Sequence, residues 1–308
     1  MNEPTLSPAA LATAPNATVA SGWQQTARAL FQLCKPRLAF FSILSALAAY
    51  ASVPAGAGWL HLMLSATGIT LAAGGALSLN QWWERPIDAK MQRTADRPLP
   101  RGQVSSPVAL AWSLTLSISS LLLLGLWVNP LSALLAASTI VLYGLVYTPL
   151  KRRTRWATEI GSISGALPPL LGAAAAGQVH TPVAWTLAAI LLFWQMPHFY
   201  GIGWMYRTDY RKAGFPLLPA IDPSGQRTAN WSLGYTIGLG IVSLLPWFLG
   251  WFNALYGVVA LLAFAFMLWR TLQFRNAHEN RDPAARKMFL ATVLYLPPIL
   301  IALVLAAK

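Results

Sequence analysis

Charged residues are scarce in this chain. Of its 308 residues only 10% are charged and only nine are acidic, whereas 56% are hydrophobic and the mean hydropathy is +0.51. An ordinary soluble domain carries about 25% charged residues. The composition therefore excludes a soluble globular domain and predicts a protein embedded in a lipid bilayer.

Several motifs are missing as well. The single cysteine, Cys34, excludes a disulfide framework and a metal cluster held by several cysteines. The sequence has no phosphate-binding glycine loop, dinucleotide fingerprint or nucleophile elbow, which argues against an ATPase or a hydrolase. Residues 1–22 lack the basic start and compact apolar core of a signal peptide, and their composition predicts a disordered cytoplasmic tail. We expect residues 23–308 to form a single transmembrane domain.

Long apolar runs are what the sequence has instead. About nine of them are long enough to cross a bilayer as helices, so we predict an all-α polytopic bundle. The predicted spans cover residues 38–55, 61–83, 106–127, 131–150, 158–177, 182–205, 230–249, 253–271 and 288–307.

The basic residues are unequally distributed between the loops. Of the 22 lysines and arginines, all except Lys308 precede the first run or lie in every second loop, and the intervening loops have none. Although the net charge is +13, this pattern is typical of membrane topology and does not favour nucleic-acid binding. The positive-inside rule makes the basic face cytoplasmic, with the amino terminus inside and the carboxyl terminus outside. We expect a multi-pass protein of a bacterial inner membrane.

The few acidic residues are concentrated where spans meet the basic face. Asn80, Glu84 and Asp88 recur every fourth residue at the end of the second run, so a helix would place them on one stripe. Oxygen ligands of this kind suit a Mg²⁺ ion that carries a diphosphate. Arg93 and Arg97 follow directly, and guanidinium groups bind phosphate oxygens in pairs. The plainer interpretation is a solvated, polar helix end.

A second group of polar residues lies beyond the sixth run. Asp209 is surrounded by basic residues there and could share a Mg²⁺–diphosphate with the first stripe. Lys151 and Arg152 follow the fourth run, at the same basic face of the predicted bundle, and could add phosphate contacts. Deeper in the sixth run, His198 is an intramembrane ionisable residue, for which a functional role is the default hypothesis. The alternative is that His198 caps a backbone carbonyl freed by Pro197.

These motifs together resemble a known family. The pattern from Asn80 to Gly102 is similar to the first signature of the intramembrane aromatic prenyltransferase superfamily. Within it, the stretches that begin at Trp194 and Asp209 resemble the protohaem IX farnesyltransferase family. Further stretches that carry the resemblance are Lys35-Pro-Arg37, Tyr147-Thr-Pro-Leu-Lys-Arg152 and Gly165-Ala-Leu-Pro-Pro169. The chain departs from the superfamily by having Glu84 where aspartate is common, and by having no acid four residues after Asp209.

The resemblance implies nine helices around a central cavity that is open to the cytoplasm. It also implies Mg²⁺-dependent transfer of a farnesyl group from farnesyl diphosphate to a vinyl group of haem B. The product of this reaction is haem O, which serves terminal oxidases. From the residues themselves we expect Mg²⁺ ligation by Asn80, Glu84, Asp88 and Asp209, and haem contacts by His198 and Trp194. Diphosphate contacts are expected from Arg37, Arg93, Arg97, Lys151 and Arg152. Downstream haem-processing or oxidase-assembly proteins are possible partners.

Two other functions remain open from the sequence. One is a prenyltransferase that acts on a quinone precursor or a chlorin. The Trp194–His198 stretch is the feature that distinguishes the two interpretations, because a small phenolic acceptor would not need it. The other is a secondary transporter, which nine spans and a basic cavity would permit, although the sequence shows no paired half-repeat.

Overall fold

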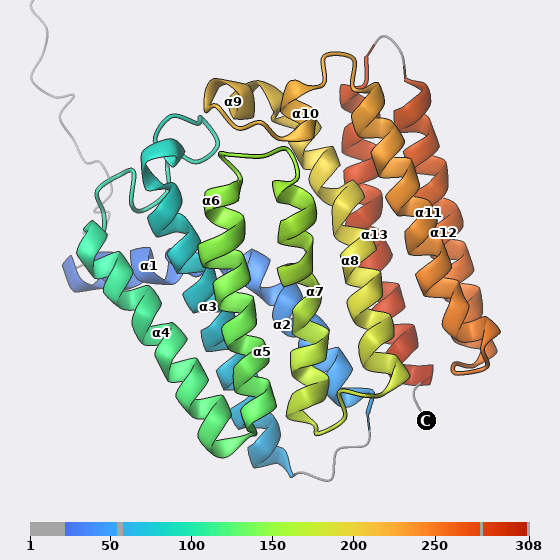
Figure 1. The fold of residues 1–308 in the computed structure, drawn as a ribbon, viewed down its shortest axis with the longest axis horizontal. Coiled ribbons are helices and arrows are strands. Elements are labelled where there is room, and N and C mark those ends of the chain that lie inside the picture. Colours follow the sequence, from blue (N-terminus) through green and yellow to red (C-terminus); the bar gives the residue numbers. More distant parts are fainter. Residues whose placement is uncertain (1–21, 54–57, 278–279, 307–308) are drawn as a thin grey trace, which may run out of the picture.

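The computed structural model describes residues 22–53, 58–277 and 280–306, and all regular structure in them is helical (Figure 1). The predicted tail 1–22 lies outside these residues except for Gly22, and Lys308 lies outside them too. The helices are α1 Gly22–Leu33, α2 Pro36–Ala51, α3 Trp59–Asp88, α4 Ser106–Trp127, α5 Pro130–Ile140, the π-helix η2 Val141–Tyr147, α6 Thr148–Leu150, α7 Ala157–Ala175, α8 Pro182–Met205, α9 Arg207–Lys212, α10 Leu218–Ile221, α11 Gln226–Phe248, α12 Ala254–Asn276 and α13 Asp282–Ala306.

The predicted all-α membrane bundle is confirmed. Each predicted span coincides with a helical segment, and α5, η2 and α6 together form the fourth. Within the described residues, six helical segments are long and apolar enough to cross a membrane, or seven if the pair α1 and α2, bent by 50°, counts as one. The helices α7 and α8 are not among the six, and they carry polar residues such as Glu159 and His198. The count of nine crossings stays a prediction.

Several helices begin with a proline, and one proline lies inside the last turn of α3. Pro36, Pro130 and Pro182 occupy first-turn positions, where a missing N–H costs nothing. Pro86 lies inside α3 and cannot donate to the carbonyl of Trp82, four residues earlier. The Arg85 guanidinium donates to that carbonyl at 2.5 Å instead. The helix therefore continues to Asp88, five residues beyond the predicted end of the span.

The main hydrophobic core lies around α8, which packs against α7, α11 and α13. The helices α2 and α7 approach each other closely. A Cβ atom on Gly172 would lie 1.8 Å from the carbonyl oxygen of Ala46, so only glycine allows this spacing. This contact joins the second half of α2 to the second half of α7.

The helix α1 runs across the bundle near the start of α4 (Figure 1). Its buried face packs Ala29 and Leu33 against Val104 and Ala109. The carbonyls of Gln32 and Leu33 accept hydrogen bonds from the Gln81 side chain at 3.1 and 3.0 Å. These contacts fix the position of the next residues in the chain, among them Lys35.

Candidate active site

The polar stripe of α3 is a buried face of the bundle. Asn80, Glu84 and Asp88 are 0%, 7% and 3% exposed. An unpaired carboxylate is costly to bury, so each acid needs a cationic partner. This rules out the solvated helix end that was the plainer interpretation of the sequence.

Cations from three different segments supply those partners. The Lys151 ammonium is 2.8 Å from Glu84 Oε1, and Arg97 Nη1 is 2.6 Å from Asp88 Oδ2 and 3.8 Å from Glu84 Oε2. The Lys35 ammonium donates to Asn80 Oδ1 at 2.6 Å. Burial opposes the charge on Lys151, but the attraction of Glu84 outweighs it and raises the pKa of that ammonium well above its ordinary value. Arg97 and Lys151 balance the two carboxylates, whereas burial lowers the pKa of the Lys35 ammonium to about 7. An anion that binds beside Lys35 would favour its charged form.

The backbone of Lys35 is unusual. With φ of 45° it is the only non-glycine residue with a positive φ among the described residues, and it precedes Pro36. Both the left-handed conformation and the following proline make this geometry unfavourable, by about 1–3 kcal/mol. The conformation turns the Lys35 side chain toward α3, where it meets Asn80.

The orientation of the Asn80 amide is fixed from both ends. Its Oδ1 accepts from Lys35, and its Nδ2 donates to the Thr148 hydroxyl at 3.0 Å. Thr148 in turn donates to the carbonyl of Tyr143 at 2.7 Å, within the π-helix η2. Short π-helical segments are frequent at functional sites. Here the wider turn precedes Thr148, the residue that anchors the amide.

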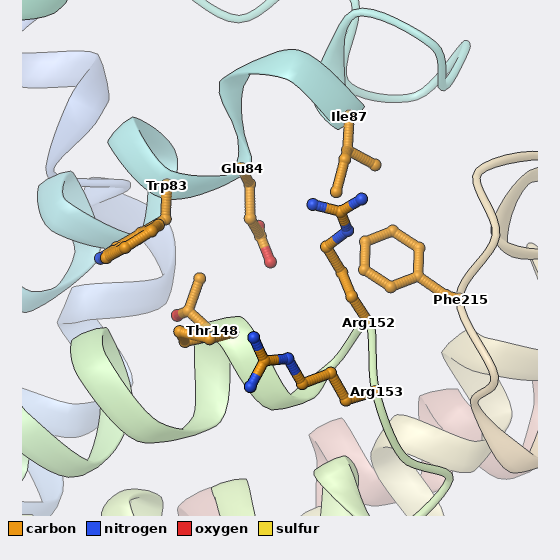
Figure 2. A pocket seen from close by; sticks show the side chains of 8 residues that line it. Trp83, Glu84, Ile87, Thr148, Arg152, Arg153 and Phe215 are labelled. Atoms are coloured by element: carbon orange, nitrogen blue, oxygen red, sulfur yellow. The ribbon is translucent and has the colours of Figure 1, made fainter.

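A cavity of about 390 Å³ opens beside this cluster. Glu84 points into it from α3, and Arg152 and Arg153 face it from the opposite wall (Figure 2). The remaining lining residues are Trp83, Ile87, Thr148, Pro149 and Phe215. A cavity with arginines on one side and a carboxylate on the other suits a phosphate-bearing ligand with an apolar tail.

Some predicted site residues lie elsewhere. Arg37 is exposed, and no contact joins it to the cluster. Arg93 donates to the Tyr210 hydroxyl at 2.8 Å and stacks over the ring of Tyr206. This contact brings the loop after α3 beside α9. Asp209 is half-buried on α9, and no group of three His, Cys, Asp or Glu side chains that could hold a metal is formed within the described residues.

His198 does not cap a backbone carbonyl. Its Nδ1 lies 2.8 Å from the Thr292 hydroxyl on α13, and its ring stacks on Trp194 with centroids 5.0 Å apart. Trp194 Nε1 donates to the carbonyl of Thr292 at 2.7 Å. Both predicted haem contacts therefore lie at the α8–α13 interface.

The sequence interpretation missed Lys35, Arg153 and a half-buried acid, Glu159. Glu159 Oε1 accepts from the Tyr200 hydroxyl at 2.5 Å, and its Oε2 is buried without a partner among the described residues. A signal for Glu159 was available, because it is an acid inside a predicted span. For Lys35 the signal was its place before a proline at the start of a span, but nothing local predicts its inward direction.

A comparison with protein families decides what this arrangement is. The sequence model of the UbiA prenyltransferase family matches residues 38–293. The chain belongs to the UbiA prenyltransferase family. That match spans both α3 and the α8–α13 interface, and it confirms the superfamily resemblance of the sequence.

Relatives within this family have been named individually. Proteins called protoheme IX farnesyltransferase are similar to this chain in Opitutus terrae (44% identical, covering 89% of this chain and 92% of that protein) and Solibacter usitatus (42%, covering 88% and 96%). A third, from Rhodopirellula baltica, is 37% identical and covers 91% of this chain and 100% of that protein. At these identities and coverages the resemblance to that branch of the family is confirmed.

Solved structures confirm the UbiA fold. A digeranylgeranylglyceryl phosphate synthase superimposes with a TM-score of 0.76, covering 92% of this chain and 99% of that chain at 17% identity. A UbiA homologue from Archaeoglobus fulgidus bound to DMAPP and Mg²⁺ has a TM-score of 0.62, covering 91% and 99% at 16% identity. These likenesses concern the fold alone.

Proposed function

We propose that this protein transfers a farnesyl group from farnesyl diphosphate to a vinyl group of haem B, which yields haem O. The observation that carries the proposal is the coincidence of two features. Relatives named protoheme IX farnesyltransferase cover most of the chain at 37–44% identity. The chain also has a buried cluster of paired charges beside a cavity of about 390 Å³.

The cluster supports ionisation of an allylic diphosphate. Such a substrate dissociates into a carbocation and diphosphate once the charge on the leaving group is stabilised. Arg97 and Lys151 are held in place before the substrate arrives, because Asp88 and Glu84 bind them. Arg152 and Arg153 line the cavity and are free to turn toward phosphate oxygens. Lys35 lies at the Asn80 end of the stripe, and its ammonium, whose pKa burial lowers to about 7, would gain charge when an anion binds.

The donor set of α3 also fits Mg²⁺. Asn80, Glu84 and Asp88 offer hard oxygen atoms on one helix face, and Asp88 Oδ1 has no hydrogen-bond partner among the described residues. Asn80 Oδ1 and Glu84 Oε1 would exchange their lysine partners for the metal. We propose these three as metal ligands, with Asp209 approaching from α9, since the Arg93–Tyr210 contact keeps that helix near the loop after α3. When bound, Mg²⁺ neutralises the diphosphate and lowers the barrier to its departure.

The acceptor is expected at the α8–α13 interface. We propose that His198 and Trp194 contact haem B there, as an imidazole ligand and an aromatic surface. The apolar interior keeps water from the carbocation until the vinyl carbon attacks it. Capture of the resulting haem cation by one water, which loses a proton, completes the hydroxyethylfarnesyl side chain.

The setting follows from the distribution of charge. We propose a bacterial inner-membrane location with the amino terminus and the active-site mouth on the cytoplasmic side, since nearly all basic residues lie on one face. The product would pass to haem-processing or oxidase-assembly proteins.

An acceptor competition in isolated membranes tests the proposal. Membranes that contain the protein are incubated with farnesyl diphosphate and an equimolar mixture of haem B, a chlorin and a phenolic quinone precursor, and the products are separated by mass spectrometry. Membranes without the protein provide the background. We expect the farnesyl group on haem B alone. Transfer to the phenol or the chlorin, with haem B unchanged, would overturn the assignment of the acceptor.

A further inference from the structure

Thr292 on α13 makes two contacts with α8. Its carbonyl accepts from Trp194 Nε1 at 2.7 Å, and its hydroxyl oxygen lies 2.8 Å from His198 Nδ1. The imidazole ring contacts the Trp194 ring and the Phe289 ring, whose centroids are 5.0 and 4.9 Å from its own. One residue of α13 therefore holds both aromatic side chains that the proposed function assigns to haem.

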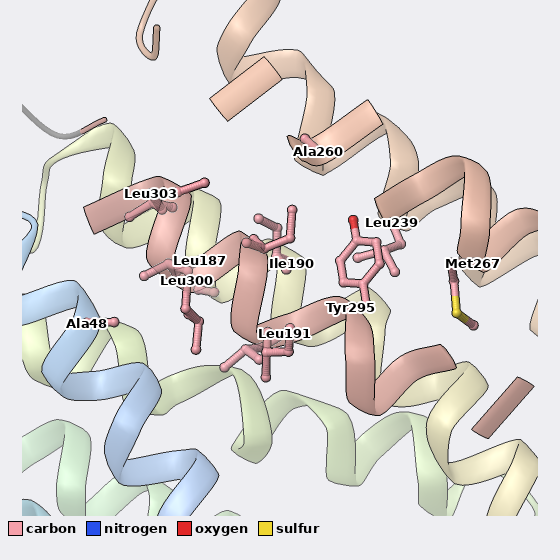
Figure 3. Packing of buried hydrophobic residues seen from close by; sticks show 14 of the residues in the cluster. Ala48, Leu187, Ile190, Leu191, Leu239, Ala260, Met267, Tyr295, Leu300 and Leu303 are labelled. Atoms are coloured by element: carbon pink, nitrogen blue, oxygen red, sulfur yellow. The ribbon is translucent and has the colours of Figure 1, made fainter. Parts of the chain in front are cut away.

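The two helices that carry these residues are firmly packed. Leu187, Ile190 and Leu191 of α8 belong to the same hydrophobic cluster as Leu300 and Leu303 of α13 (Figure 3). Close-packed cores of this kind resist small displacements. The packing of α8 against α13 consequently holds the backbones of Thr292 and His198 beside each other.

The position of one proton follows from a second contact of the same hydroxyl. Thr292 Oγ1 is also 2.6 Å from the carbonyl oxygen of Phe289. A carbonyl can only accept, so the single hydroxyl proton of Thr292 must lie between these two oxygens. The hydroxyl then has only a lone pair left for His198, and Nδ1 must be the donor. In the neutral imidazole this leaves Nε2 unprotonated, with a free lone pair.

We propose that Thr292 is a positioning residue that fixes His198 as its Nδ1–H tautomer and presents Nε2 to the iron of the tetrapyrrole substrate. The inference rests on the proposed function and names a residue for it. A histidine that binds a metal ion usually donates its other ring N–H to an oxygen acceptor, which sets both tautomer and ring orientation. Within the described residues Nε2 has no hydrogen-bond partner, so the lone pair is not already engaged.

The ordinary alternative is that the hydroxyl only joins two helices. Interhelical hydrogen bonds of serine and threonine stabilise membrane bundles modestly. In that case removal of the hydroxyl would lower the stability of the protein without selecting a tautomer or altering bound haem. Spectroscopic readouts separate the two roles.

Three variants suit the experiment. Thr292→Val removes the hydroxyl at nearly constant shape, and Thr292→Ser restores it. Thr271→Val is the matched control, because Thr271 is a fully buried threonine whose hydroxyl bonds Met267 and Thr236 and contacts no histidine. All are prepared in lipid nanodiscs and compared with the wild type for retained folding by thermal unfolding.

The first readout is the tautomer, measured without haem. Nitrogen-15 NMR of histidine-labelled protein distinguishes protonated from unprotonated ring nitrogens, and His198→Gln assigns the signal. We expect Nδ1–H with unprotonated Nε2 in the wild type, Thr292→Ser and Thr271→Val, and a mixture of tautomers in Thr292→Val. An unchanged tautomer in a folded Thr292→Val protein would overturn the proposal.

The second readout is a titration with haem B followed by its Soret band. Loss of such a supporting hydrogen bond typically weakens metal binding by roughly 10- to 100-fold. We expect that loss and a shifted band in Thr292→Val alone, with farnesyl diphosphate affinity unchanged in every variant. An equal loss in Thr271→Val would identify a packing effect and contradict the proposal. A wild-type protein that binds no haem B would overturn the proposed function and the ligand role with it, whereas the NMR result would still decide whether Thr292 sets the tautomer.

Discussion

At the scale of single residues, the proposed site consists of charges that are buried in pairs. Glu84 and Asp88 are held by Lys151 and Arg97. Pairs of this kind add little to stability, since desolvation offsets most of their attraction. The pairs keep two cations ordered beside the cavity before the substrate binds. Without them, part of the binding free energy of the diphosphate would be lost in ordering these side chains.

The first prediction concerns the two carboxylates. We expect Glu84→Gln and Asp88→Asn each to lower the rate of prenyl transfer by roughly a hundredfold or more, because a Mg²⁺–diphosphate site loses a ligand worth about 3 kcal/mol of transition-state stabilisation. The measurement is the initial rate at saturating Mg²⁺. Asp96→Asn is the matched control, because Asp96 is an exposed acid paired with Arg101 outside the cluster. Near-normal rates in both core variants would contradict the site.

A second prediction separates two neighbours of Pro36. Lys35 contacts Asn80, whereas Arg37 is exposed. We expect Lys35→Met to raise the KM for farnesyl diphosphate at least about tenfold, as expected for loss of one charge-assisted contact, and Arg37→Met to change it little. An equal rise in KM in the two variants would mean that Arg37 also reaches the substrate, and an unchanged KM in both would contradict the role of Lys35.

At the scale of elements, the sequence predicted what depends on local spacing. The four-residue period of Asn80, Glu84 and Asp88 predicts their common face correctly, because a helix repeats every 3.6 residues. The end of α3 was placed five residues too early, because the side chain of Arg85 compensates for Pro86. The direction of His198 depends on the rotation of α8 against α13, and the direction of Lys35 depends on a left-handed turn. Neither property can be read from local sequence.

The contact between α2 and α7 gives a prediction at this scale. We expect Gly172→Ala to destabilise the protein by about 1–3 kcal/mol, because its methyl group would collide with the backbone of Ala46. Thermal unfolding in nanodiscs measures the change. Gly234→Ala on α11 is the control, since a Cβ there meets nothing within 4 Å. If the two alanine variants unfold at the same temperature, α2 and α7 are not packed as closely as described.

At the scale of the whole molecule, topology remains to be tested. Asn129 caps α5 and Arg152 follows α6, so a single span separates them. We predict that reporter fusions at these two positions give opposite results, with Arg152 cytoplasmic, because the basic loops lie on that side. Fusions that report the same compartment would be incompatible with the arrangement.

The central claim is that this one chain joins a farnesyl group to haem B at a Mg²⁺-supported diphosphate site. Its most direct test is a mass-spectrometric assay of the purified protein in liposomes, with farnesyl diphosphate, haem B and Mg²⁺ as the only additions. We predict a product heavier than haem B by one farnesyl and one hydroxyl group, and its loss when the metal is removed with a chelator. Intact haem B in the presence of both substrates and Mg²⁺, with protein shown to be folded, would contradict the account.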